Sequence, residues 1–223
     1  MIEMDEIFSD SDKRIAVWCE TVADTNDLAM LCEQIVAHKV SLISVPPEVV
    51  QSFWTYLEKN KVKIFTRYNV NSNPKNIDSD MFKLGADIVS VCKNGASGVQ
   101  LFIKIHDFEL VVNSLLAVRD DLFFGHDLSV VMDIEDLDMN NLGLVSQKLR
   151  EIRADSFALT LNEDAGNRSD FVGRIYALLQ QFDFGGELHF ILGNNFDRID
   201  QVVRLTECLR PELSDKLRFF LDY

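Results

Sequence analysis

The sequence predicts an α/β protein, a (β/α)8 TIM barrel from which the last helix is missing. Eight short apolar runs alternate along the chain with seven segments whose apolar residues recur at helical spacing. Such regular alternation requires parallel strands joined by right-handed crossovers, and eight of these units close most simply into a barrel. The length of 223 residues suits one domain of this kind. An open, doubly wound sheet is the alternative that the pattern leaves.

The expected strands are short apolar runs that end in polar or turn-forming residues. In chain order they span residues 14–20, 40–45, 62–68, 98–107, 128–134, 156–161, 187–192 and 217–221. The fourth run, GVQLFIKIHD, is apolar at most positions, as expected of a strand that is buried on both faces. We therefore place this strand at the centre of the prediction.

The expected helices carry apolar residues on one face, and several have a start or stop signal. Asp24 and Thr25 offer an N-cap to the first helix, Pro47 suits the start of the second, and Asn94-Gly95 suits the end of the third. The first helix contains Leu28, Leu31, Cys32 and Ile35, and the others span residues 48–59, 77–93, 108–118, 141–152, 169–182 and 198–209.

We expect an acidic tail over residues 1–13 and a single barrel domain over residues 14–223. The chain stops just after the eighth strand, at Asp222-Tyr223, so the helix that usually covers this flank is missing. A bare apolar flank is uncommon on a monomer. Either a helix between the tail and the first strand covers it, or a second subunit does, and we therefore expect a homodimer.

The composition excludes several classes of partner. The 22 basic and 36 acidic residues give a net charge of −14, which opposes binding to nucleic acid and to anionic lipid. The sequence has no secretory signal and no run of the ~18 apolar residues that a membrane span needs, so we expect a cytoplasmic protein. The four cysteines form no CxxC pair, and we expect reduced thiols, no metal site and no cofactor.

The first third of the chain resembles the deoxyribose-phosphate aldolase family. The matching residues are Asp27-Leu28, the segment LCEQ at 31–34, the segment VSLISVPPEVV at 40–50 and the segment VKIFTRYNV at 62–70. The segment KNGASGVQ at 93–100 is similar to the approach to strand four in that family. Beyond it, the resemblance lies in the order and spacing of the strands.

This resemblance implies a class I aldolase, in which a lysine on strand six forms a Schiff base with an aldehyde. An acid on strand four and a second lysine on strand seven would assist it. In this sequence Leu159 and Phe190 stand in place of the two lysines, and Gln100 replaces the acid. Phosphate binding is also in doubt, because strand eight ends in Asp222, whose carboxylate would repel a phosphate.

Lys104 lies near the end of the fourth expected strand. Burial of a lysine disfavours its charged form and so makes a nucleophilic amine available. Strand alternation places Gln100, Phe102 and Lys104 on one face, and the aldolase register makes that face the barrel interior, with Asp133 nearby. Lys104 is then either a displaced Schiff-base lysine with Asp133 as acid or base, or half of a buried ion pair that fills the barrel.

The other candidates are polar residues at the carboxyl ends of strands, where barrels of this type keep their active sites. The catalytic candidates are Lys104, Asp133 and Tyr68, and the substrate-binding candidates are Thr66, Arg67, Gly193, Asn194 and Asn195. Further polar residues at these ends are Glu20, His106, Glu135, Asn162, Glu163 and Asp222. The spacing of His106 and the acidic residues after strand five matches no metal motif.

Two functions of different class follow from these residues. The first is a divergent aldolase-like lyase that acts on a small carbonyl or sugar-derived metabolite, with Lys104 as the nucleophile. The second is a barrel that has lost catalysis and serves as a binding or assembly protein, as the missing lysines would suggest.

Overall fold

The structure is a computed structural model that describes residues 14–22, 25–70, 77–122, 125–138, 140–161 and 171–223. Its strands form one closed, parallel barrel in the order β1-β2-β3-β4-β5-β6-β7-β8, with β1 paired to both β2 and β8. The strands are β1 (Ile15–Trp18), β2 (Leu42–Val45), β3 (Lys63–Asn69), β4 (Gly98–Phe102), β5 (Asp127–Asp133), β6 (Ser156–Thr160), β7 (Glu187–Ile191) and β8 (Leu217–Asp222). The predicted barrel is confirmed, and the open sheet is excluded.

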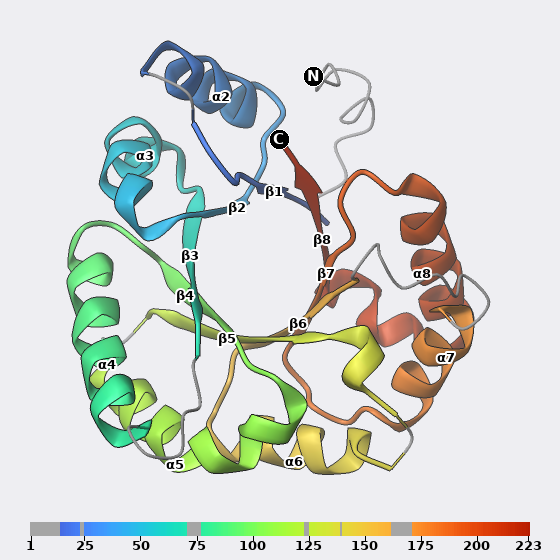
Figure 1. The fold of residues 1–223 in the computed structure, drawn as a ribbon. Helices are drawn as coiled ribbons and strands as arrows, with labels where there is room; N and C mark the ends of the chain where they lie inside the picture. The colour runs from blue at the N-terminus through green and yellow to red at the C-terminus, as the bar shows by residue number, and fades with distance from the viewer. Residues whose placement is uncertain (1–13, 23–24, 71–76, 123–124, 139, 162–170) are drawn as a thin grey trace.

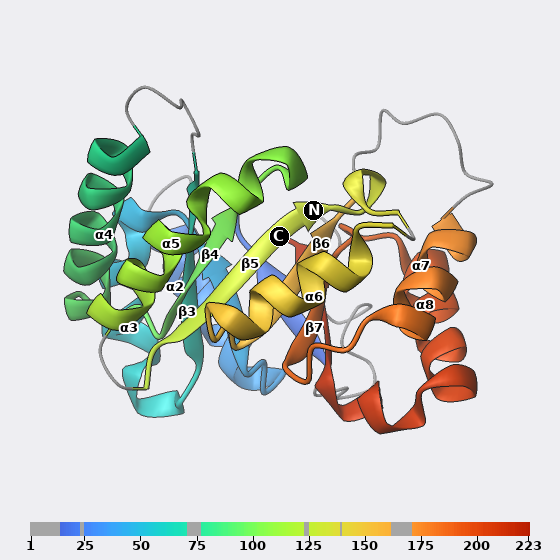
Figure 2. The same cartoon turned by 90° about the horizontal axis from the view of Figure 1, so that it is seen from below.

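The α-helices form a ring around the outside of the barrel, one between each pair of successive strands (Figures 1 and 2). They are α2 (Thr25–Ala37), α3 (Val50–Leu57), α4 (Ile77–Lys93), α5 (Ile105–Asp121), α6 (Leu142–Glu151), α7 (Phe171–Gln181) and α8 (Phe196–Leu209). Parallel neighbours need such crossovers, because the chain must return to the same end of the barrel before each new strand. None of the described helices has the length and apolar character that crossing a membrane requires.

Alternation along each strand divides the apolar side chains between two cores. One core fills the space between strands and helices and contains residues such as Val17, Leu101 and Phe157. The other lies inside the barrel and consists of Ala16, Trp18, Leu42, Phe65, Val131, Ala158, Ile191 and Phe220, with Phe102 packed against them. Successive residues therefore face opposite cores, and this decides which polar residues can reach the barrel mouth.

The fourth strand is shorter than its apolar run predicts. β4 ends at Phe102, the backbone N–H of Ile103 still donates to the carbonyl of Val131 over 2.9 Å, and α5 begins at Ile105. Lys104 is the N-cap residue of α5, with extended backbone angles (φ −73°, ψ 143°). The expected strand to residue 107 is therefore wrong. Ile103, which is 3% exposed, is buried at the junction between β4 and α5 and does not extend the strand.

The flank between β8 and β1 is not bare. No described helix follows β8, as the sequence predicts, yet most outward side chains of both strands are buried. Phe219 is 1% exposed, and Val17 and Leu221 are 2% exposed. These side chains are covered within the single chain, so the expectation of a bare flank is wrong, and the homodimer stays a prediction without that support.

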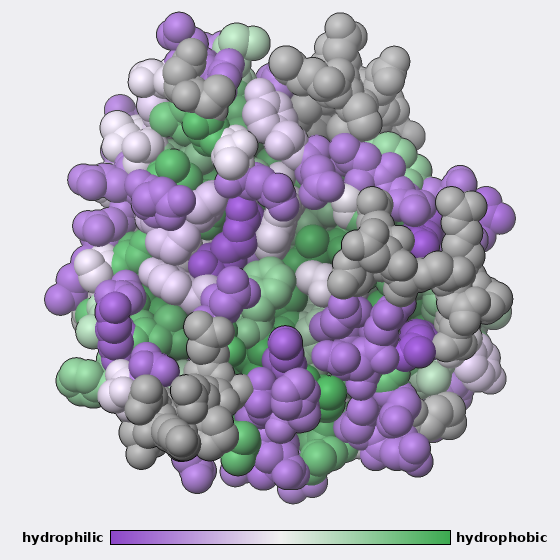
Figure 3. Space-filling model, in the orientation of Figure 1, coloured by the Kyte–Doolittle hydropathy of each residue, from purple (hydrophilic) through white to green (hydrophobic). Residues whose placement is uncertain are grey.

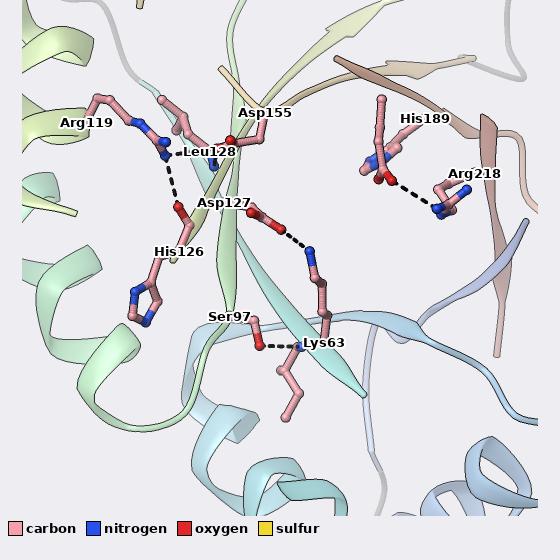
Figure 4. Close-up of polar contacts among 11 residues, drawn as sticks. Lys63, Ser97, Arg119, His126, Asp127, Leu128, Asp155, His189 and Arg218 are labelled. Carbon is pink, nitrogen blue, oxygen red and sulfur yellow. Dashed lines mark hydrogen bonds and ion pairs between the residues drawn. The ribbon is translucent and has the colours of Figure 1, made fainter. Parts of the chain in front are cut away.

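The amino ends of the strands carry a set of ion pairs (Figure 4). Lys63 Nζ lies 2.6 Å from Asp127 Oδ2, joining β3 to β5, and Arg218 Nη2 lies 2.9 Å from Glu187 Oε1, joining β8 to β7. Side chains that are paired in this way bind each other and are not available to bind a ligand. The opposite, carboxyl end of the strands is where barrels of this type keep their active sites.

Candidate functional site

At the carboxyl ends of the strands, the centre of the molecular face shows hydrophobic residues between hydrophilic ones (Figure 3). A cavity of about 590 Å³ lies over β3 to β6. Its lining is Asn69, Val70, Phe102, Ile103, Lys104, His106, Val131, Met132, Asp133, Asp136 and Thr160. An apolar wall with a few polar groups that converge on it is typical of a small-molecule site.

Lys104 lines this cavity but does not lie inside the barrel. As the N-cap residue of α5 it stands above the end of β4, and its side chain is exposed to solvent. The prediction of a buried lysine is wrong, because the strand ends two residues before it. Within the described residues Lys104 forms no ion pair with Asp133, so the alternative of a buried ion pair is wrong as well.

Asp133 is the last residue of β5 and borders the same cavity as Lys104. Its Oδ1 accepts a hydrogen bond of 2.9 Å from the backbone N–H of Glu135. Burial raises the pKa of the Asp133 carboxyl, and the nearby charge of Asp136 raises it further, against the lowering effects of the Glu135 N–H and of Arg174. Burial thus makes Asp133 a weaker acid than a free aspartate, so its carboxyl group is suited to exchange a proton with a ligand in the cavity.

Arg67 points into the barrel from β3 and packs on an aromatic ring. Its guanidinium carbon lies 4.2 Å from the centre of the Trp18 ring, and its Nη2 donates a hydrogen bond of 2.7 Å to the carbonyl of Cys19. Its Nη1 is buried and has no hydrogen-bond acceptor in the described part of the protein. Burial lowers the pKa of Arg67, while Glu20 acts in the opposite direction. The guanidinium is thus held in place by the ring and the carbonyl, and its Nη1 could still donate a hydrogen bond to a ligand.

Thr66 and Tyr68 face away from the barrel mouth. They flank Arg67 on β3, so alternation turns both toward the helices when Arg67 points inward. Thr66 is 0% exposed, and Tyr68 packs against the outer core. Burial raises the pKa of the Tyr68 phenol to about 12, with the charge of Asp87 as the next contribution. The structure therefore does not bring Tyr68 together with Lys104 and Asp133.

The turn after β7 brings Gly193, Asn194 and Asn195 beside the end of β8. Gly193 has a left-handed backbone (φ +58°), and a Cβ at this position would lie 2.8 Å from Asp222 Oδ2. Asn194 Nδ2 donates 3.2 Å to the backbone carbonyl of Asp222, and Asn195 Oδ1 accepts 3.2 Å from the N–H of Arg198. A cavity of about 550 Å³ is lined by Asn194, Asn195, Phe196, Asp197 and Asp222.

The chain was compared with family models, with curated proteins and with solved structures. No family model matches, and no curated protein matches at a significant level. The deoxyribose phosphate aldolase from Aeropyrum pernix has 14% sequence identity and a TM-score of 0.70, over 96% of this chain and 87% of that one. An aldolase named QR15 has 11% identity and a TM-score of 0.71, over 95% of this chain and 91% of that one. The chain resembles these aldolases in fold.

The same fold also serves other chemistry. Endonuclease IV from Thermus thermophilus has 14% identity and a TM-score of 0.62, over 94% of this chain and 92% of that one. An aldolase and a nuclease thus share the architecture at similar sequence identity. The fold alone therefore does not identify a function, which must be inferred from the side chains of this protein.

The aldolase register predicts that Leu159 and Phe190 replace the two family lysines, and the structure corrects this placement. Both side chains are 0% exposed and lie in the outer core, facing the helices. A lysine that reacts with a bound aldehyde must face the barrel interior. The inward positions on β6 are Ala158 and Thr160, and on β7 they are His189 and Ile191, so neither strand carries an interior lysine.

Several residues of the mouth are absent from the sequence prediction. They are Trp18, Asn69 and Thr160. The alternation of β1 would have indicated Trp18, whereas Asn69 and Thr160 depend on where each strand ends. Among the described residues no group of three His, Cys, Asp or Glu side chains is placed to hold a metal ion. Asn162 and Glu163 lie outside the described residues.

Proposed function

We propose that this protein is a divergent aldolase-like lyase that acts on a small carbonyl or sugar-derived metabolite in the cavity over β3 to β6. The observation that carries this proposal is that Lys104 and Asp133 border one open cavity without being paired to each other. A carbonyl compound in that cavity would have an amine and a carboxyl group on adjacent strand ends. The two groups supply a nucleophile and a proton donor.

The chemistry is that of a Schiff base. The amine of Lys104 adds to the carbonyl carbon and passes one of its protons to the carbonyl oxygen. Asp133 gives that oxygen a second proton, and the oxygen leaves as water. The resulting iminium withdraws electrons from the adjacent carbon–carbon bond. The Asp133 carboxylate then accepts the proton of the β-hydroxyl as the bond between the α- and β-carbons breaks, which releases an aldehyde and leaves an enamine on Lys104. Asp133 returns this proton to the α-carbon, and water hydrolyses the iminium so formed, which releases the second carbonyl compound, frees Lys104 and gives a proton back to Asp133.

Trapping with borohydride tests this route. The protein is incubated with glycolaldehyde, acetaldehyde or glyceraldehyde, reduced, digested and examined by mass spectrometry for an alkylated lysine. The matched control is Lys59→Met, which removes an exposed lysine ahead of β3, at the opposite end of the barrel. We expect an adduct on Lys104 that is lost in Lys104→Met and kept in Lys59→Met. Absence of an adduct on Lys104 of the wild-type protein with every aldehyde, together with a Lys104→Met variant that folds normally, would exclude the Schiff-base lyase.

A second candidate is a barrel that binds the same kind of metabolite without catalysis. The solvent exposure of Lys104 and the absence of an interior lysine on β6 and β7 favour it. In that case Lys104→Met would leave the affinity for the metabolite unchanged, whereas Asp133→Asn or Arg67→Met would weaken it. Calorimetric titration of the same compounds into these variants separates the two candidates.

A further inference from the structure

The corner of the mouth formed by β7 and β8 is lined by carboxylates. Asp197 and Asp222 both border the cavity of about 550 Å³ beside the turn after β7. Asp222 Oδ2 approaches Gly193 so closely that even a Cβ would meet it at 2.8 Å. A negatively charged group of a ligand in this corner would lie next to two negative side chains.

The amino end of α8, which also points to this corner, does not compensate for these charges. An uncapped helix amino end attracts anions through its free N–H groups and its dipole. Here Asn195 Oδ1 accepts from the N–H of Arg198, and Asp197 adds a carboxylate to the first turn. The positive end of the helix is therefore already balanced by the side chains of the protein itself.

The cations of the mouth are balanced in the same way. Arg67 experiences the charges of Glu20, Glu48 and Asp222, and its guanidinium is turned to the Trp18 ring and to the carbonyl of Cys19. Lys104 shares its cavity with Asp133 and Asp136. Around each cation the acidic groups are in excess, so the donor groups of Arg67 suit an uncharged oxygen better than a phosphate.

We propose that a substrate bound over β3 to β6 extends its polar end into the corner between β7 and β8, that this substrate is an uncharged, hydroxylated carbonyl compound, and that the corner discriminates against phosphate monoesters of such compounds. This inference rests on the proposed function, because it names the class of metabolite that the same mouth would accept. A hydroxyl group can donate to Asp222 or Asp197 and accept from Arg67, whereas a phosphate dianion can only accept. The polarity of the corner thus matches a sugar-like hydroxyl.

Paired ligands that differ only in the phosphate test the proposal. Glyceraldehyde and glyceraldehyde phosphate, and deoxyribose and its phosphate monoester, are titrated into the wild-type protein at constant ionic strength. We expect each uncharged compound to bind at least about tenfold more tightly than its ester. This is the effect on affinity of repulsion by one nearby carboxylate that is partly screened by solvent. Asp222→Asn should narrow this difference severalfold, whereas Glu58→Gln, which removes an exposed charge before β3, should leave it unchanged.

The outcomes separate this inference from the function on which it rests. The inference is supported if the wild-type protein binds the uncharged compounds more tightly and if Asp222→Asn reduces this preference. Equal or tighter binding of the esters overturns it and leaves a metabolite-binding barrel in place. Failure of all four compounds to bind overturns both, provided that the wild-type protein and both variants unfold at similar temperatures.

Discussion

His189 is a fully buried histidine inside the barrel, between Phe65 and Phe220, with ring centres 6.3 Å and 5.6 Å away. Its Nε2 lies 3.1 Å from Glu187 Oε2, and since a carboxylate only accepts, the ring donates this hydrogen bond. Burial lowers the pKa of His189, against the raising effect of Glu187, while Arg218 lowers it and Asp127 raises it. The hydrogen bond from His189 lowers the pKa of Glu187. The pair is a neutral imidazole held by a carboxylate.

Stability should depend on pH through this histidine. A histidine with a lowered pKa binds its proton more readily in the unfolded state, so the free energy of unfolding falls as the pH drops below about 6.5, by at most about 1.4 kcal/mol per pH unit. Urea unfolding between pH 7 and pH 5 measures this loss. In His189→Gln the loss should be smaller, since glutamine can still donate to Glu187 but does not titrate.

The exposed His106 gives the matched control, because His106→Gln removes a histidine whose side chain is 69% exposed. It should keep the pH dependence of the wild-type protein. Equal slopes in wild type and His189→Gln would show that other groups cause the dependence. Glu187, whose pKa is also lowered, stabilises the fold in a separate and more acidic range, where stability is lost as the pH falls through its lowered pKa.

At the scale of one element, β4 depends on the absence of a side chain at its first residue. A Cβ on Gly98 would lie 2.7 Å from Phe65 Cε1 and 2.8 Å from the backbone carbonyl oxygen of Asp127. The carbonyl belongs to the paired strand β5 and cannot move without disturbing that pairing. Glycine therefore lets β3, β4 and β5 approach one another at the amino end of the barrel.

Gly98→Ala should lower the free energy of unfolding by about 1–3 kcal/mol, the usual cost of overpacking. The matched control is Gly143→Ala in α6, where a new Cβ meets nothing within 4 Å. There the same substitution should leave stability unchanged or raise it by up to about 1 kcal/mol, because alanine favours helices. Chemical unfolding of the two variants gives both values. If Gly98→Ala leaves the free energy of unfolding unchanged, β4 must shift to make room for the methyl group.

The whole molecule carries a net charge of −14, which opposes its own compact state through repulsion. Raising the salt concentration from about 0.01 M to 0.15 M shortens the screening length from about 30 Å to 8 Å. The free energy of unfolding in urea should therefore rise with salt. Sodium chloride and potassium chloride should act alike, since screening does not depend on the identity of the ion. A fall in the free energy of unfolding with added salt would show that ion pairs such as Lys63–Asp127 outweigh the general repulsion.

The order and kind of the elements could be predicted from the sequence, because both depend on local periodicity. Apolar runs and helical faces are formed by residues that are close together in the sequence, and the closed barrel follows from their regular alternation. The approximate region of the site follows too, since the polar residues after each strand meet at one end. Arg67, Asp133 and Asn194 all lie there, as expected.

The direction and reach of each side chain were decided by the tertiary structure. A shift of one residue turns a strand side chain from the interior to the helix layer, which is why Tyr68, Leu159 and Phe190 face outward. The end of β4 depends on its pairing with β5, and that pairing stops near Val131, so Lys104 emerges into solvent. Strand register and strand ends are set by contacts between segments distant in the sequence, which local patterns do not contain.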